Sequence, residues 1–98
     1  MEKLSEEQIA TRMADLGEWS QLGDTLQRTF RFDDFLASIA FVNTIAALAE
    51  AEQHHPDVLV RYDKVTLTLT THDVGGLTEN DFALARAADQ TVPSSSAP

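Results

Sequence analysis

The stretch VLVRYDKVTLTLTTH, residues 58–72, decides the fold because its second half alternates with a period of two. Val65, Leu67 and Leu69 fall on one face of an extended chain, and the threonines fall on the other face, which ends at His72. Successive side chains of a β-strand point to opposite faces of the sheet. The pattern therefore predicts a strand with one buried face and one polar face.

A tight hairpin is predicted within the same stretch. VLVRY, residues 58–62, and KVTLTLTTH, residues 64–72, both have the composition of strands. So few residues separate the two runs that an antiparallel turn around Asp63 and Lys64 is the simplest connection. We therefore expect an antiparallel sheet.

A long apolar helix is predicted directly before this hairpin. It begins at Asp33-Asp34, either of which can cap it, and it ends near residue 54 because Pro56 disfavours the helical conformation of the residue before it. Two apolar stripes run along it: Phe35, Ile39, Val42, Ala46 and Ala49 form the first, and Phe41, Ile45 and Leu48 form the second. One side can meet a sheet while the other meets another subunit.

The remaining elements complete an α+β pattern. A helix is predicted over residues 5–16, two strands over residues 18–32, and a last helix from the capping-box-like segment at residues 78–81. The order helix-strand-strand-helix-strand-strand-helix predicts a four-stranded antiparallel sheet with three helices on one face. Residues 1–90 are expected to form a single domain, and residues 91–98 a flexible tail.

Charge and composition exclude several classes of function. Seven Lys and Arg against sixteen Asp and Glu give a net charge of −9, which repels nucleic acid and anionic lipid. The chain has no cysteine, hence no thiolate metal site and no Cys nucleophile, and its longest apolar run is interrupted before membrane length. We expect a cytoplasmic protein that binds neither nucleic acid nor a membrane. Because 98 residues form only a small core, self-association is also expected.

All three histidines are expected at the ends of predicted elements, where functional groups are often held by a rigid scaffold. His54 and His55 stand at the end of the long helix, and His72 ends the last strand. Glu50 lies four residues before His54, so its carboxylate could fix the tautomer of that imidazole. Asp81 stands at the start of the last helix.

Each of these residues also has a purely structural explanation. The helix-end histidines could interact with the helix dipole, Asp81 could be a capping residue, and Trp19 could simply pack. A metal site that uses Glu50 and His54 is an open alternative, although the adjacent His55 can rarely converge on the same ion. No nucleophile elbow or phosphate-binding loop is present in the sequence.

Taken together, the spacings resemble the signature of the pterin-4a-carbinolamine dehydratases: Glu50-x3-His54-His55-Pro56-x5-Tyr62-x9-His72-x8-Asp81. The segment VTLTLTTHDVGGLTENDFALA is similar to their final strand, Gly corner and last helix, and the resemblance extends back to Trp19. One departure is Val58, where many members of that family carry an aromatic residue.

The resemblance implies that the substrate is a 4a-hydroxytetrahydropterin and that the products are a quinonoid dihydropterin and water. It implies His54 and His72 as general acids and His55 as a base or anchor. Glu50 and Asp81 would orient imidazoles or the pterin, and Trp19 is assigned to the same substrate-binding group. No cofactor or metal is implied.

The resemblance also implies partners. Similar proteins are dimers or tetramers, and an aromatic amino acid hydroxylase would supply the substrate. Relatives of the same fold include a dimerisation partner of a transcription factor and an assembly aid for a carbon-fixing enzyme. A non-catalytic interaction protein is therefore the alternative prediction.

Overall fold

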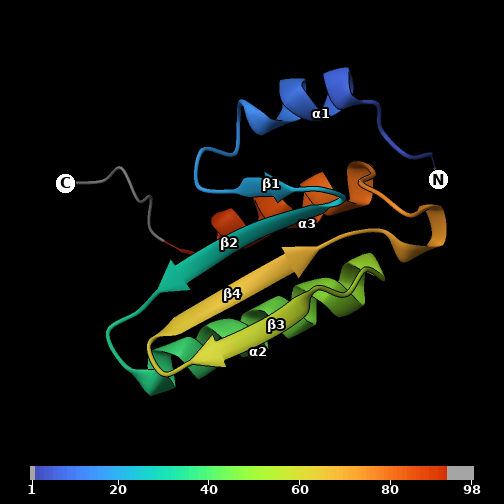
Figure 1. Ribbon diagram of the computed structural model, residues 1–98. Coiled ribbons are helices and arrows are strands. Elements are labelled where there is room, and N and C mark those ends of the chain that lie inside the picture. Colours follow the sequence, from blue (N-terminus) through green and yellow to red (C-terminus); the bar gives the residue numbers. More distant parts are fainter. Residues whose placement is uncertain (1, 93–98) are drawn as a thin grey trace.

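A computed structural model describes residues 2–92 (Figure 1). Met1 and residues 93–98, the latter part of the expected tail, lie outside the described residues. The elements are α1 (Glu6–Met13), β1 (Ser20–Leu22), β2 (Thr25–Arg31), α2 (Phe35–Glu52), β3 (Asp57–Arg61), β4 (Lys64–Leu69), the 3-10 helix η1 (His72–Val74) and α3 (Glu79–Asp89).

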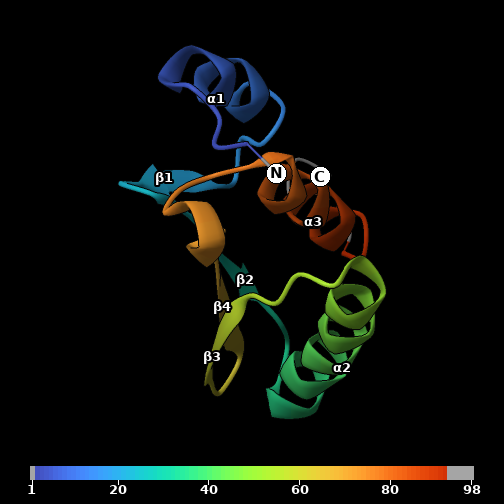
Figure 2. The same cartoon turned by 90° about the vertical axis from the view of Figure 1, so that its right-hand side faces the viewer.

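The strands form one antiparallel sheet in the order β1-β2-β4-β3. The predicted hairpin is present as β3 and β4, with Val60 opposite Val65, and β4 is inserted beside β2, with Phe30 opposite Val65. In Figure 2, α2 and α3 lie along one face of the sheet, and α1 lies beyond the β1 end. The predicted α+β class and element order are confirmed.

The core lies between the sheet and these helices, because the alternation in β2 and β4 directs one row of side chains inward. Its fully buried members are, from the strands, Leu26, Phe30, Val65, Leu67 and Leu69 and, from the helices, Ile45, Phe82, Leu84, Ala85 and Ala88. The ring of Phe30 contacts that of Phe41 on α2 at a centroid distance of 4.5 Å. Burial of these apolar surfaces is the main force that holds the helices on the sheet.

Side-chain caps start the helices as the sequence predicts. Ser5 and Gln8 form a capping box at α1, and Asp34 accepts a hydrogen bond of 2.8 Å from the backbone N–H of Ala37 at α2. Such caps satisfy backbone donors that have no partner inside the helix. The first helix ends at Met13, three residues earlier than predicted.

The two apolar stripes predicted for the long helix lie on α2, and they differ in burial along its length. Phe41, Ile45 and Ala49 are buried, whereas Phe35 and Leu36 at its start remain 47% and 78% exposed. By length and composition alone, α2 could also span a membrane. Its contact with the sheet accounts for the same composition, because a helix that packs on a sheet needs an apolar face.

The end of β4 corrects one prediction. The strand ends at Leu69, and His72 begins η1 instead of closing the polar face of the strand. The backbone N–H of Thr71 donates to the carbonyl of Gly76 at 3.0 Å, and Gly75 adopts a φ of 65°. The chain therefore turns back across residues 72–75, through a left-handed position at Gly75 that glycine tolerates.

Candidate active site

The end of α2 separates two adjacent histidines. Gln53 caps the helix in the left-handed conformation, with φ 54° and ψ 39°. The backbone N–H of His54 donates to the carbonyl of Ala49 at 3.1 Å, and Pro56 follows one residue after His55. The helical spacing therefore stops before His54, so Glu50 and His54 no longer share a helix face.

His54 pairs with Asp81, not with Glu50 as predicted. Its Nε2 lies 2.6 Å from Oδ1 of Asp81, which opens α3. The His54 side chain is 11% exposed and that of Asp81 is 0% exposed. The other carboxylate oxygen, Oδ2, accepts hydrogen bonds of 2.8 Å from the Thr71 hydroxyl and from the Thr78 backbone N–H. The buried carboxylate thus has a hydrogen-bond partner on each oxygen.

Glu50 instead contacts the second histidine. Oε2 of Glu50 lies 2.5 Å from Nε2 of His55, and both side chains are well exposed, at 74% and 60%. The left-handed backbone at Gln53 explains this pairing. It turns the His54 side chain away from Glu50 and brings the His55 side chain close to the Glu50 carboxylate. Each of these two imidazoles therefore has its own carboxylate.

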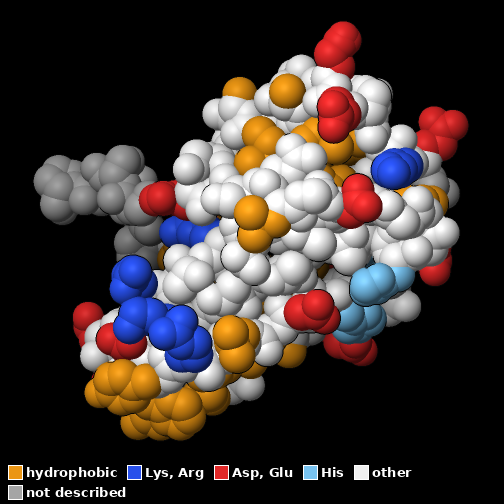
Figure 3. All heavy atoms as spheres, in the orientation of Figure 1, with side chains coloured by type: hydrophobic (Ala, Val, Ile, Leu, Met, Phe, Trp, Pro, Cys, Tyr) orange, Lys and Arg blue, Asp and Glu red, His pale blue; other side chains and the backbone are white. Residues whose placement is uncertain are grey.

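All three histidines line one hollow of about 220 Å³, together with Gln53, Thr70, Thr71 and Asp73. Two segments line it, the residues after α2 and the turn from β4 into η1, and Asp81 near the start of α3 contacts one lining residue, His54 (Figure 1). Figure 3 shows the histidine side chains gathered on this part of the surface, bordered by acidic side chains. The arrangement offers several imidazoles to a small molecule, which suits proton transfer to and from it.

A family model described as "Pterin 4 alpha carbinolamine dehydratase" matches residues 2–91 of this chain. The chain belongs to that family. A relative from Chloroflexus aurantiacus is 54% identical over 92 residues, which cover 94% of this chain and 99% of the relative. A relative from Thermosynechococcus vestitus is 51% identical over 85 residues, with coverage of 87% and 90%. Both carry the provisional name pterin-4-alpha-carbinolamine dehydratase.

Two solved structures are similar to this dehydratase-family chain. A protein of Brucella melitensis, described as a transcriptional coactivator/pterin dehydratase, is 30% identical, with a TM-score of 0.90 and coverage of 94% of this chain and 100% of its own. A pterin dehydratase-like protein, described as a RuBisCO assembly factor in the alpha-carboxysome, is 28% identical, with a TM-score of 0.68 and coverage of 80% and 93%. Proteins with this fold are therefore described both as pterin dehydratases and as coactivators or assembly factors.

Trp19 lies apart from the histidines in this family member. Its side chain is 4% exposed, and its indole N–H donates to Oδ1 of Asp89 at 2.8 Å, at the end of α3. It is not among the residues that line the histidine hollow. The structure thus places Trp19 in the core, next to Phe30, with a ring-centroid distance of 6.0 Å.

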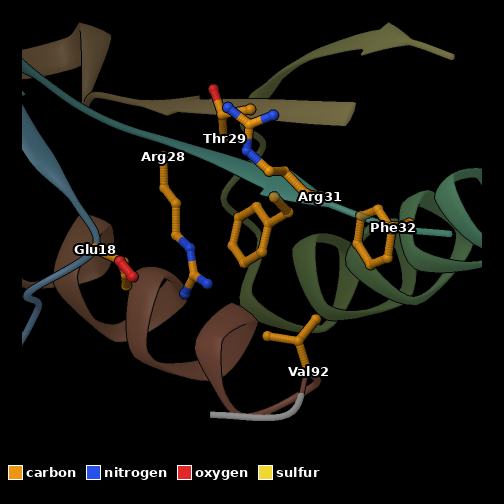
Figure 4. A pocket seen from close by; sticks show the side chains of 7 residues that line it. Glu18, Arg28, Thr29, Arg31, Phe32 and Val92 are labelled. Atoms are coloured by element: carbon orange, nitrogen blue, oxygen red, sulfur yellow. The ribbon is translucent and has the colours of Figure 1, made fainter. Parts of the chain in front are cut away.

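A larger hollow in the described part of this dehydratase-family chain holds no histidine. It measures about 410 Å³ and is lined by Glu18, Arg28, Thr29, Phe30, Arg31, Phe32 and Val92. Figure 4 shows Arg28 directed toward α3, while Thr29 and Arg31 point to the other side of β2. The Arg28 guanidinium is already paired with Asp89 at 2.6 Å and lies 4.1 Å from the centre of the Phe30 ring. These contacts give it a structural role.

The contacts that two threonines of this family member make with Asp81 were not predicted from the sequence. Thr71 and Thr78 both contact Asp81, and their hydroxyl oxygens lie 2.9 Å apart. The capping-box pattern at Thr78 was the only signal available, because the approach of Thr71 depends on the turn through Gly75 and Gly76. Among residues 2–92, no three His, Asp or Glu side chains are grouped closely enough to hold a metal ion.

Proposed function

We propose that this chain is a 4a-hydroxytetrahydropterin dehydratase that acts in tetrahydropterin recycling, with a quinonoid dihydropterin and water as its products. The observation that carries the proposal is that His54, His55 and His72 line one hollow in a chain of this family. The hollow, at about 220 Å³, is open, and a flat bicyclic substrate could enter it edge first.

The reaction needs two proton transfers and no change of oxidation state. The bond from C4a to the hydroxyl oxygen breaks as that oxygen receives a proton, and a ring nitrogen gives up its proton, so water and the quinonoid ring are the only products. Imidazole is suited to both tasks because it changes charge near neutral pH. The proposal therefore requires no resident cofactor and no metal.

The roles in this proposal follow the resemblance to the family, and the structure supplies the carboxylate partners of His54 and His55. His54 and His72 act as general acids toward the departing hydroxyl, and His55 acts as a base or anchor at the pterin ring. Asp81 orients His54 through its 2.6 Å contact, and Glu50 orients His55 through its 2.5 Å contact. Because Trp19 is buried beside Asp89, the proposal gives it no contact with the pterin.

The proposal includes a homodimer or homotetramer. Large apolar side chains are exposed on two elements, Phe35 and Leu36 on α2 and Val58 and Leu59 on β3. β3 is also an edge strand, which leaves one row of its backbone groups free to pair with another chain. A cytoplasmic location, with an aromatic amino acid hydroxylase as the source of substrate, belongs to the same proposal.

A second candidate function is a non-catalytic interaction protein. The descriptions of the two similar structures, a coactivator and an assembly factor, favour it. The exposed apolar side chains on α2 and β3 would then meet a different protein instead of a second copy. Three histidines around one hollow are not needed for such a role, which favours the catalytic function.

Stopped-flow spectroscopy tests the choice directly. A chemically generated 4a-hydroxytetrahydropterin decays in buffer, and the protein should accelerate that decay. The Thr66→Val variant is a matched control, since Thr66 lies on the outer face of β4, bonded to Thr29 at 2.8 Å, and does not line the histidine hollow. If the wild-type protein gives no acceleration over buffer, the interaction function replaces the catalytic one.

A further inference from the structure

Asp81 lies at the end of a continuous chain of hydrogen bonds that starts in the backbone of α3. The Asn80 N–H donates to the Thr78 hydroxyl at 3.2 Å, and the Thr78 and Thr71 hydroxyl oxygens are 2.9 Å apart. The Thr71 hydroxyl reaches Oδ2 of Asp81 at 2.8 Å. Thr78 and Asp81 are 0% exposed, so solvent does not reach the side chains of these two residues.

The number of protons on each group fixes which atom donates in each of these hydrogen bonds. A backbone N–H can only donate, so the Thr78 oxygen accepts from Asn80. A hydroxyl has a single proton, and the Thr71 proton goes to Asp81; Thr78 must therefore donate its own proton to Thr71. Every proton in the chain points toward Oδ2 of Asp81.

The same oxygen accepts a second donor, the Thr78 backbone N–H at 2.8 Å. Two donors on Oδ2 leave no room for a proton on that oxygen, and they stabilise the ionised form of the carboxylate. The remaining oxygen, Oδ1, then acts as an acceptor toward His54 at 2.6 Å. A neutral His54 ring that faces a carboxylate with Nε2 must carry its proton there, which leaves Nδ1 without one.

We propose that Thr71 and Thr78 are positioning residues that hold Asp81 as a carboxylate and thereby fix His54 with its proton on Nε2. Nδ1 is then the nitrogen that exchanges a proton with the substrate. In the cationic ring, Nδ1 gives its proton to the departing hydroxyl as the bond to C4a breaks, and His54 returns to the neutral Nε2–H form. The catalytic part rests on the proposed function, whereas the tautomer does not.

The tautomer can be measured without substrate on the full-length chain labelled with ¹⁵N. Long-range ¹H–¹⁵N correlation spectra separate a protonated ring nitrogen from an unprotonated one, and the chain has only three histidines to assign. The expected result is a neutral His54 ring with the proton on Nε2. A wild-type proton on Nδ1 would overturn the proposal.

Three variants test the threonine chain. Thr71→Val removes the donor with little change of shape; it should give a mixture of His54 tautomers and lower dehydratase turnover by roughly tenfold, a fraction of what a positioned acid supplies. Thr71→Ser keeps the hydroxyl and should restore both readouts. Thr66→Val, the same replacement on the outer face of β4, should change neither. An unchanged tautomer in Thr71→Val overturns the proposal.

Asp81→Asn gives an independent measurement if the threonine variants fold poorly. The amide oxygen should take the Thr78 N–H, so the amide NH₂ would face His54 and the ring proton should move to Nδ1. A ring that keeps its Nε2 proton in this variant contradicts the proposal. Should the wild type show the expected tautomer but no turnover, the dehydratase function fails while the role of the threonines in setting the tautomer stands.

Discussion

Asp89→Ala should destabilise the protein because one carboxylate oxygen holds two other elements. Oδ1 of Asp89 accepts from the Trp19 indole N–H at 2.8 Å and from Arg28 Nη1 at 2.6 Å. The Arg28 side chain is only 12% exposed, so its charge stays largely desolvated after Asp89 is removed. Losing the indole bond costs about 1 kcal/mol, and losing the bond to the charged group about 2 kcal/mol.

One effect opposes this loss. Asp89 is the last residue of α3, where a negative charge is unfavourable toward the helix dipole by about 0.3 to 1 kcal/mol, and alanine removes that term. The net loss should be about 2 kcal/mol, which for a domain of this size lowers Tm by about 8 to 16 °C. Thermal and urea unfolding followed by circular dichroism measure both quantities.

The Trp19→Phe variant supplies the control. It removes the indole N–H together with the five-membered ring, so it should cost about 1 kcal/mol for the bond and a further amount for the gap left in the core. Combined with Asp89→Ala, its cost should fall by about 1 kcal/mol, since the two changes break the same bond. If Asp89→Ala costs less than about 0.5 kcal/mol, or if the two effects are fully additive, the assigned role of the shared oxygen is refuted.

Three further changes test the site and the fold. Replacing His54 and His72 together with alanine should lower turnover by about 10² or more in the stopped-flow assay, because two acid–base groups are lost; unchanged turnover would remove them from the mechanism. The Arg12 guanidinium, which binds Glu79 in two places, lowers the pKa of that carboxyl from its ordinary value of 4.5. The stabilisation should therefore be complete above that value and disappear as the pH falls below it, so urea unfolding of Glu79→Gln should differ from wild type at neutral pH and converge with it in acid; a constant difference would contradict this. Phe82→Ala, at a side chain that is 0% exposed, should cost about 3 to 5 kcal/mol in urea unfolding, and a loss below about 1 kcal/mol would mean that the core closes around the gap.

The architecture was predictable where short-range patterns decide it. The alternation from Val65 to Leu69 sets which face of β4 is buried, and the caps at Ser5, Asp34 and Thr78 set where the helices begin. These features depend on residues a few positions apart, so a single sequence contains them. The presence of the hairpin followed from the short separation of its two runs, but the turn is at Tyr62 and Asp63, one residue earlier than predicted, so the register did not follow.

The pairing of carboxylates with imidazoles was not predictable in the same way. A helical spacing joins Glu50 to His54, but the left-handed Gln53 cancels that spacing and gives Glu50 to His55. Gln53 carries no glycine-like signal that would reveal its φ of 54°. Likewise, the contact of His54 with Asp81 spans 27 positions and depends on how α3 packs. Two features therefore decide which carboxylate each imidazole contacts: the long-range packing of α3 and the left-handed backbone at Gln53.

That long-range contact links the proposed activity to the order of folding events. The isolated helix α2 could form early, yet it would present His54 without Asp81, because the start of α3 arrives only when the sheet and both helices have docked. Recovery of turnover in a refolding experiment would therefore follow tertiary assembly and lag behind the return of helical content. The His54–Asp81 pair would make the proposed turnover a late reporter of the native state.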